Sequence, residues 1–150
     1  MGTGIYGGFG NTEGVVENNT REKAKLIAEL KKSGVKFTEQ DIVFITKDKT
    51  GQIVWLEKGN QSAGLEHILN GNGKSPGHAA DFERAVGISR ENLPSFLKCV
   101  ISNGDVISNV IKIVNNRKGY ERIYQYNGKH YVLTGIGTNG FIVTAYPVKL

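Results

Sequence analysis

The chain has 150 residues, a formal net charge of +5 and a single cysteine, Cys99. This length is enough for one domain with its own apolar core, and one cysteine excludes a disulfide framework or a cysteine-based zinc cluster. No apolar stretch approaches the roughly 20 residues that a membrane-spanning helix needs. The basic balance favours a polyanionic partner such as nucleic acid.

The N-terminal part of the chain is predicted to contain a leader followed by a helix. Residues 1–18 hold six glycines and are predicted to be flexible. The helix is predicted to begin at about Asn19, its N-cap, with Glu22 completing a variant of the capping box. Gly34 is predicted to end it. We therefore divide the chain into a leader, 1–18, and a folded domain, 19–150.

The middle of the chain predicts two strands followed by helices. Apolar runs bounded by polar turns predict strands at 42–46 and 53–56. Short helices are predicted at 65–69 and 81–86, separated by a loop rich in glycine and asparagine. A longer helix is predicted at 93–103, because its apolar residues recur at helical spacing.

From residue 106 onward the apolar residues alternate with period two, which is typical of strands. An Asn-Gly pair between two alternating runs is the strongest short-range hairpin signal, and two such pairs occur here. Because helices precede an antiparallel meander, the sequence predicts an α+β fold in which N-terminal helices pack on a C-terminal sheet. The four predicted strands are 110–114, 120–126, 129–135 and 141–148.

The hairpins also predict which side chains share a face of the sheet. If each Asn-Gly pair is a two-residue loop, Arg122 lies opposite Leu133, and Leu133 lies opposite Tyr146. In the next row, Thr144 lies opposite Gly135. Arg122, Thr144 and Tyr146 then project from one face, with Arg122 and Tyr146 about 10 Å apart at their backbones. Such side chains could converge on one small anion.

Lys112 is a further candidate for this face. It lies opposite Arg122 if residues 115–119 form a five-residue loop, and a bridging phosphate would offset the repulsion between the two cations. Alternatively, the lysine side chain extends into solvent, or the register differs by one residue. Thr144 and Tyr146 are equally consistent with ordinary strand residues, because both types favour strands.

Two histidines, His67 and His78, flank the loop rich in glycine and asparagine. A pair of imidazoles can act as general base and general acid near neutral pH, and RNA cleavage by the 2′-hydroxyl requires that pairing. Cationic or hydroxyl donors must then stabilise the charge on the phosphorane. Alternatively, each histidine is a solvated or capping residue. The third, His130, is predicted to be a surface residue of a strand.

Two motifs resemble known toxins. Residues 16–19 read VENN, which resembles the junction that precedes the exchangeable C-terminal toxin domain in contact-dependent growth inhibition and related polymorphic toxins. Residues 65–78, LEHILNGNGKSPGH, resemble the histidine block of bacterial poly(U)-specific endoribonuclease-like (EndoU) toxin domains. Residues 142–147, IVTAYP, resemble their Thr-x-Tyr-Pro ending. EndoU domains belong to the wider barnase–EndoU–colicin–RelE (BECR) ribonuclease superfamily.

This resemblance implies an endoribonuclease that uses no metal or other cofactor and leaves 2′,3′-cyclic phosphate ends. His67 and His78 match the two histidines of the family, as acid and base in either order. Thr144 and Tyr146 match its closing hydroxyl pair, and Tyr146 would position or stack on a base. In place of the glycine pair before the second histidine, this chain has proline and glycine.

A cation that neutralises the phosphate completes the site implied by the resemblance. Lys112 matches the lysine of the family, and Arg122 is the alternative, because other branches of the superfamily use a different cation.

As a toxin domain, the chain is expected to be secreted or delivered from a cell surface within a larger toxin. It would act on transfer RNA or another RNA in the cytoplasm of the target cell. Such a ribonuclease would poison its maker, so we expect a cognate immunity protein, acidic to match the positive surface. Two alternatives remain: a non-catalytic RNA-binding module that uses the basic sheet and its tyrosines, and a toxin nuclease that acts on DNA.

Overall fold

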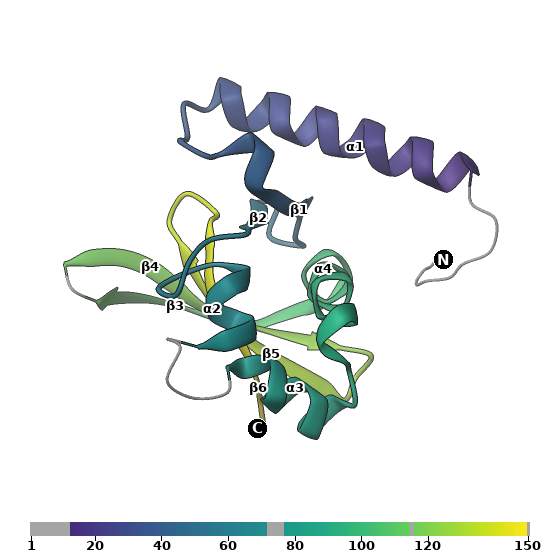
Figure 1. The fold of residues 1–150 in the computed structure, drawn as a ribbon. Coiled ribbons are helices and arrows are strands. Elements are labelled where there is room, and N and C mark those ends of the chain that lie inside the picture. Colours follow the sequence, from purple (N-terminus) through teal and green to yellow (C-terminus); the bar gives the residue numbers. More distant parts are fainter. Residues whose placement is uncertain (1–12, 72–76, 115, 150) are drawn as a thin grey trace. The chain divides into compact units, whose positions relative to one another are not determined.

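The computed structural model describes residues 13–71, 77–114 and 116–149 (Figure 1). The chain divides into two compact units between Phe37 and Thr38. The first contains α1 (Glu13–Lys32), which has two lysines in its last turn, where they complement the negative end of the helix dipole.

Helix α1 begins earlier than the sequence predicts. The VENN residues 16–19 lie inside the helix, and so do the last residues of the predicted leader. Residues 1–12 of the predicted leader lie outside the described residues.

The second unit contains the remaining helices and all the described strands. They form the predicted α+β fold. Among the described residues, no helix combines the length and the apolar character needed to cross a membrane. The helices are η1 (Glu39–Asp41), α2 (Leu65–Asn70), α3 (His78–Val86), η2 (Arg90–Asn92) and α4 (Leu93–Asn103), and the strands are β1 (Ile42–Lys47), β2 (Ile53–Glu57), β3 (Asp105–Val114), β4 (Arg117–Tyr126), β5 (His130–Gly137) and β6 (Ile142–Val148).

The strands form two antiparallel sheets, a β1–β2 hairpin and a meander in the order β3-β4-β5-β6. The hairpin joins the larger sheet at the β5–β6 turn, where the backbone N–H of Trp55 donates to the carbonyl of Gly140 over 3.0 Å. Helix α4 has four buried apolar residues, which form one core cluster with sheet residues such as Tyr124 and Val132. One face of the sheet therefore faces the core, and we call it the core face.

The predicted register of β4 against β5 is wrong by one residue. The loop has three residues, 127–129, so that Tyr126 pairs with His130. Asn127 and Gly128 both adopt positive φ, and Lys129 then adds one more residue to the turn. Because side chains alternate between faces, this shift moves each β4 side chain to the opposite face from the predicted one. Arg122 pairs with Thr134 and lies on the core face.

The predicted register of β5 against β6 is confirmed where it matters for the site. Gly135 pairs with Thr144, and Leu133 pairs with Tyr146. Nearer the turn the register changes, because β6 has one residue more than β5 between consecutive pairs. This extra residue, Val143, forms a bulge. Thr144 and Tyr146 lie on the face opposite Arg122, and we call it the open face.

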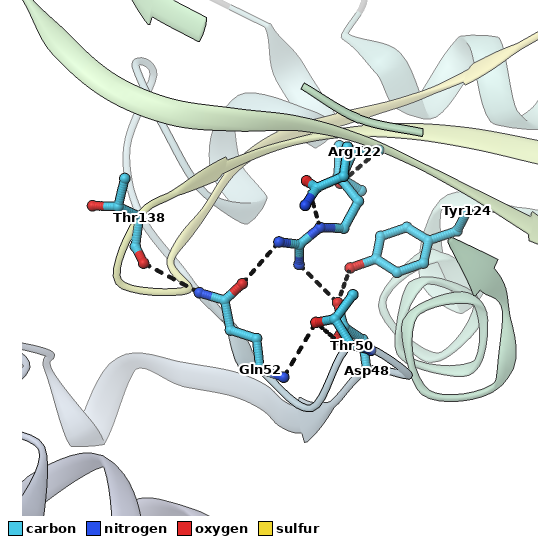
Figure 2. A network of polar contacts seen from close by, with 8 residues as sticks. Asp48, Thr50, Gln52, Arg122, Tyr124 and Thr138 are labelled. Atoms are coloured by element: carbon cyan, nitrogen blue, oxygen red, sulfur yellow. Dashed lines mark hydrogen bonds and ion pairs between the residues drawn. The ribbon is translucent and has the colours of Figure 1, made fainter. Parts of the chain in front are cut away.

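Arg122 is held in a buried network of polar side chains (Figure 2). Its guanidinium donates to Asp48 over 2.7 Å, to Gln52 over 2.9 Å and to Asn109 over 3.0 Å. The hydroxyl of Tyr124 donates to the same oxygen of Asp48 over 2.7 Å. Burial raises the pKa of Tyr124, which keeps this hydroxyl protonated. The network ties the β1–β2 turn to β3 and β4.

The ion pair between Arg122 and Asp48 predicts a large effect on stability. Replacing Arg122 by methionine is expected to lower the free energy of unfolding by about 3–5 kcal/mol, because Asp48 is left buried without its cation. Urea denaturation measures the change. The double variant Arg122→Met/Asp48→Asn is expected to recover part of the loss. A loss below about 1 kcal/mol for the single variant, the range of an exposed pair, would contradict the assignment.

Candidate active site

Three aromatic side chains from different elements meet at β6. The rings of His67 on α2 and His78 on α3 lie 5.9 Å apart between centroids, edge to face. The ring of His78 stacks on Tyr146 of β6, with centroids 4.9 Å apart and an interplanar angle of 29°. All three residues are partly exposed. The structure therefore brings together both predicted catalytic histidines and one of the two predicted hydroxyl residues.

A glycine immediately before α3 makes this arrangement possible. A Cβ atom on Gly77 would lie 2.4 Å from the backbone nitrogen of Gly71 and 2.6 Å from that of Asn70. Only glycine therefore allows the start of α3 to approach the end of α2 so closely. Because His78 is the first residue of α3, this approach places it beside His67. This glycine belongs to the Pro-Gly pair noted in the sequence.

Helix α2 is in turn fixed to β6 by its own leading glycine. The backbone N–H of Gly64 donates to the carbonyl of Val143 over 2.9 Å. Val143 is the bulged residue of β6, so its carbonyl is not needed to pair that position with β5. Gly64 has a φ of 90° and packs against the carbonyl of Glu57, which favours glycine there. The bulge thus fixes the start of α2, the helix that carries His67, to the strand that carries Tyr146.

The hydrogen bonds of the two histidines define which ring nitrogen faces a ligand. Nδ1 of His67 lies 2.9 Å from the carbonyl oxygen of Gln61, and Nδ1 of His78 lies 3.1 Å from a carboxylate oxygen of Asp81. Both partners accept, so Nδ1 carries the proton in each ring. Proton transfer to or from a ligand therefore falls to Nε2 of each.

Asp81 is a site residue that the sequence analysis missed. It accepts from His78 and, through its other oxygen, from Arg84 over 2.6 Å. The three residues follow one another at a spacing of three along α3, so their side chains share one face of the helix. That spacing is visible in the sequence and could have identified Asp81.

Thr144 lies two residues before Tyr146 on the open face. Its Oγ1 is buried and has no hydrogen-bond partner among the described residues. The residue opposite is Gly135, and a Cβ there would lie 3.1 Å from the methyl group of Thr144. A buried hydroxyl without a partner is unfavourable, so Thr144 is a candidate to donate to a bound ligand.

The two predicted cations are placed very differently. Lys112 pairs with Gly119, which pairs with Gly137, so that Lys112 lies on the open face with Thr144. The prediction that Lys112 stands opposite Arg122 is therefore wrong. Lys112 is exposed and lies three strands from β6, about 14 Å away at usual strand spacing. Arg122 lies on the core face, whereas Thr144 and Tyr146 lie on the open face. The prediction that the three side chains share a face is therefore wrong.

His130 lies away from this cluster, at the start of β5. Its ring packs edge to face on Phe96 of α4, with centroids 6.2 Å apart. Burial lowers its pKa, and the charge of Lys129 adds to this effect. We therefore treat His130 as a packing residue, suited to serve as a control for the other two histidines.

No protein-family model matches the chain, and no curated protein is significantly similar to it. Among the described residues, no three side chains of histidine, cysteine, aspartate or glutamate gather as ligands of a metal ion would. The assignment of function therefore depends on the geometry of the histidine cluster and on the sequence motifs.

Stacking of Tyr146 on His78 predicts a spectroscopic signature. In Tyr146→Ala the ring protons of His78 are expected to lose the ring-current shift that a stacked tyrosine imposes, whereas in Tyr146→Phe they keep it. Two-dimensional NMR of histidine-labelled protein measures these shifts. The ring protons of His130 serve as the internal control. Equal shifts of His78 in both variants would contradict the stacked arrangement.

Proposed function

We propose that this protein is an endoribonuclease in which His67 and His78 act as a general acid–base pair. The observation that carries the proposal is the pair of imidazole rings 5.9 Å apart, each with Nδ1 engaged, so that Nε2 is the nitrogen for proton transfer. Cleavage by a neighbouring 2′-hydroxyl needs one group to take a proton and another to give one. It leaves a 2′,3′-cyclic phosphate.

The partners of the two rings support an assignment of roles. His67 donates to a carbonyl, which is uncharged, so its Nε2 lone pair suits the general base that takes the proton of the 2′-hydroxyl. When protonated, His78 forms an ion pair with the carboxylate of Asp81, so it suits the general acid. This acid protonates the 5′-oxygen as it leaves.

The open face supplies groups for binding the substrate. The buried hydroxyl of Thr144 would donate to a phosphate oxygen, and Tyr146 would present an aromatic edge or face to a base. Lys112 lies on the same face, three strands away, where it suits a neighbouring phosphate of the chain better than the one that reacts. The guanidinium of Arg122 is engaged in the core by Asp48, so it does not reach a phosphate on the open face.

The VENN tetrapeptide supports a biological role for this activity. We propose that the chain is the toxic part of a larger toxin delivered between bacteria, acting on RNA in the cytoplasm of the target cell. Its maker would then need an immunity protein that binds it.

An assay on total RNA tests the activity. In EDTA, the wild-type protein is expected to produce fragments that end in 2′,3′-cyclic phosphate. His67→Ala and His78→Ala are each expected to lower the rate by about 10²–10⁴, the usual contribution of a general acid or base. His130→Ala is the matched control and is expected to keep the wild-type rate. Binding of RNA without cleavage would favour the RNA-binding module instead, and cleavage of plasmid DNA alone would favour the nuclease acting on DNA.

A modified substrate tests the roles of the two histidines. An oligoribonucleotide with sulfur in place of the 5′-bridging oxygen at one linkage has a leaving group that needs no proton. His78→Ala is expected to cleave this linkage at close to the wild-type rate, although it fails on normal RNA, because only the acid step is lost. His67→Ala is expected to fail on both. Rescue of His67→Ala by the sulfur, and not of His78→Ala, would reverse the assignment.

A further inference from the structure

Strand β3 is an outer strand of the four-stranded sheet, and its character is unusual for such an edge. It has ten residues, and within the described part of the second unit only β4 pairs with it. Natural sheets protect long edges with charge, proline or bulges, because an open edge pairs readily with another strand. Here the bulge lies near the start, between Val106 and Ser108, and the rest of the strand is regular.

The edge strand exposes large apolar side chains. Ile111 is 54% exposed and Ile113 is 70% exposed, and both lie on the continuation of the core face. Val110 on the other face is 49% exposed. Apolar groups gathered on an open strand mark a surface that another protein covers.

The tip of the β3–β4 hairpin extends past the end of β5 (Figure 1). Strand β5 ends at Gly137, which pairs with Gly119, so Arg117 and Lys118 pair with β3 alone. We call residues 106–120 the arm.

The arm is strongly basic. It contains Lys112, Arg117 and Lys118, all exposed, and it has no aspartate or glutamate. Lys112 and Arg117 lie on the open face, whereas the exposed isoleucines lie on the other. Lys118 of β4 pairs with Ile113 and so shares the face of the isoleucines, and Val110 shares the face of Lys112. A strand placed beside β3 would therefore meet the two isoleucines on one face and Lys112 on the other.

We propose that the outer edge of β3 is the docking site of an acidic protein, which adds a strand to the sheet. The added strand alternates apolar residues, which pack on Ile111 and Ile113, with acidic residues, which pair with Lys112 and are attracted by Arg117 one strand further in, on β4. A second copy of this chain fits poorly, because it would bring the cations of two arms together. RNA would pair with the cations but would leave the isoleucines uncovered. In the setting of the proposed function, this partner is the immunity protein.

A synthetic strand tests the proposal without requiring ribonuclease activity. The probe is a ten-residue peptide with blocked termini that alternates valine and glutamate, and its counterpart alternates valine and lysine. The first peptide is expected to bind the full chain and to protect amides of β3 from hydrogen exchange, measured by NMR, while the second does neither. Binding is expected to weaken with added salt. Protection elsewhere in the sheet but not on β3 would overturn the proposal.

Variants of the arm separate the contributions of charge and apolar contact. Lys112→Glu/Arg117→Glu is expected to weaken binding of the Val-Glu peptide by about tenfold or more, whereas Lys129→Glu, in the loop at the other end of β4, leaves it nearly unchanged. Ile111→Lys/Ile113→Lys is expected to weaken binding despite its added positive charge.

Two outcomes would show that another kind of partner binds the arm, and either would overturn the proposal. One is an RNA oligonucleotide that protects the β3 amides in place of the Val-Glu peptide and is unaffected by loss of the isoleucines. The other is a concentration-dependent dimer of the wild-type chain that Ile111→Lys/Ile113→Lys abolishes. If the peptide binds as expected but the protein cleaves no RNA, the docking site stands and the proposed function fails.

Discussion

The ion pair between Arg122 and Asp48 is the interaction on which the arrangement of the second unit depends. It joins the turn of a small hairpin to the middle of the larger sheet, in a place where neither charge is exposed to water. A buried charge is tolerated only when it is well paired, so the β1–β2 turn is constrained to this position. Because the core face packs on the core, a substrate or partner can reach the sheet only at the open face or at the edges of the sheet.

The histidine cluster depends on backbone contacts more than on side-chain packing. Gly77 lets one helix start against the end of another, and Gly64 ties the first of them to the bulge in β6. A bulge redirects a strand and leaves a carbonyl for a new partner, and here that partner is the helix that carries His67. The placement of the two histidines therefore depends on two glycines, at positions where a larger side chain would clash with the neighbouring backbone.

The two surfaces of interest lie at opposite edges of one sheet. The histidine cluster borders β6, whereas the basic arm is built on β3, with two strands between them. A partner on the arm would occupy the approach to the open face from one side without contacting the histidines. Mutation of the exposed isoleucines of the arm would then separate partner binding from catalysis.

The α+β class, the order of the strands and the β5–β6 register that pairs Leu133 with Tyr146 follow from the sequence alone, because alternation and an Asn-Gly turn are local signals. The predicted strands 110–114 and 120–126 are too short, because β3 begins at Asp105 and β4 at Arg117. The face of the sheet on which Arg122 lies does not follow from the sequence, because an Asn-Gly pair can also begin a three-residue loop, as it does between β4 and β5. One extra loop residue moves every β4 side chain to the other face. The buried partner Asp48 also lies 74 residues away in the sequence, and no local pattern connects the two. The tertiary structure alone therefore decided that Arg122 stabilises the core while the histidines meet at β6.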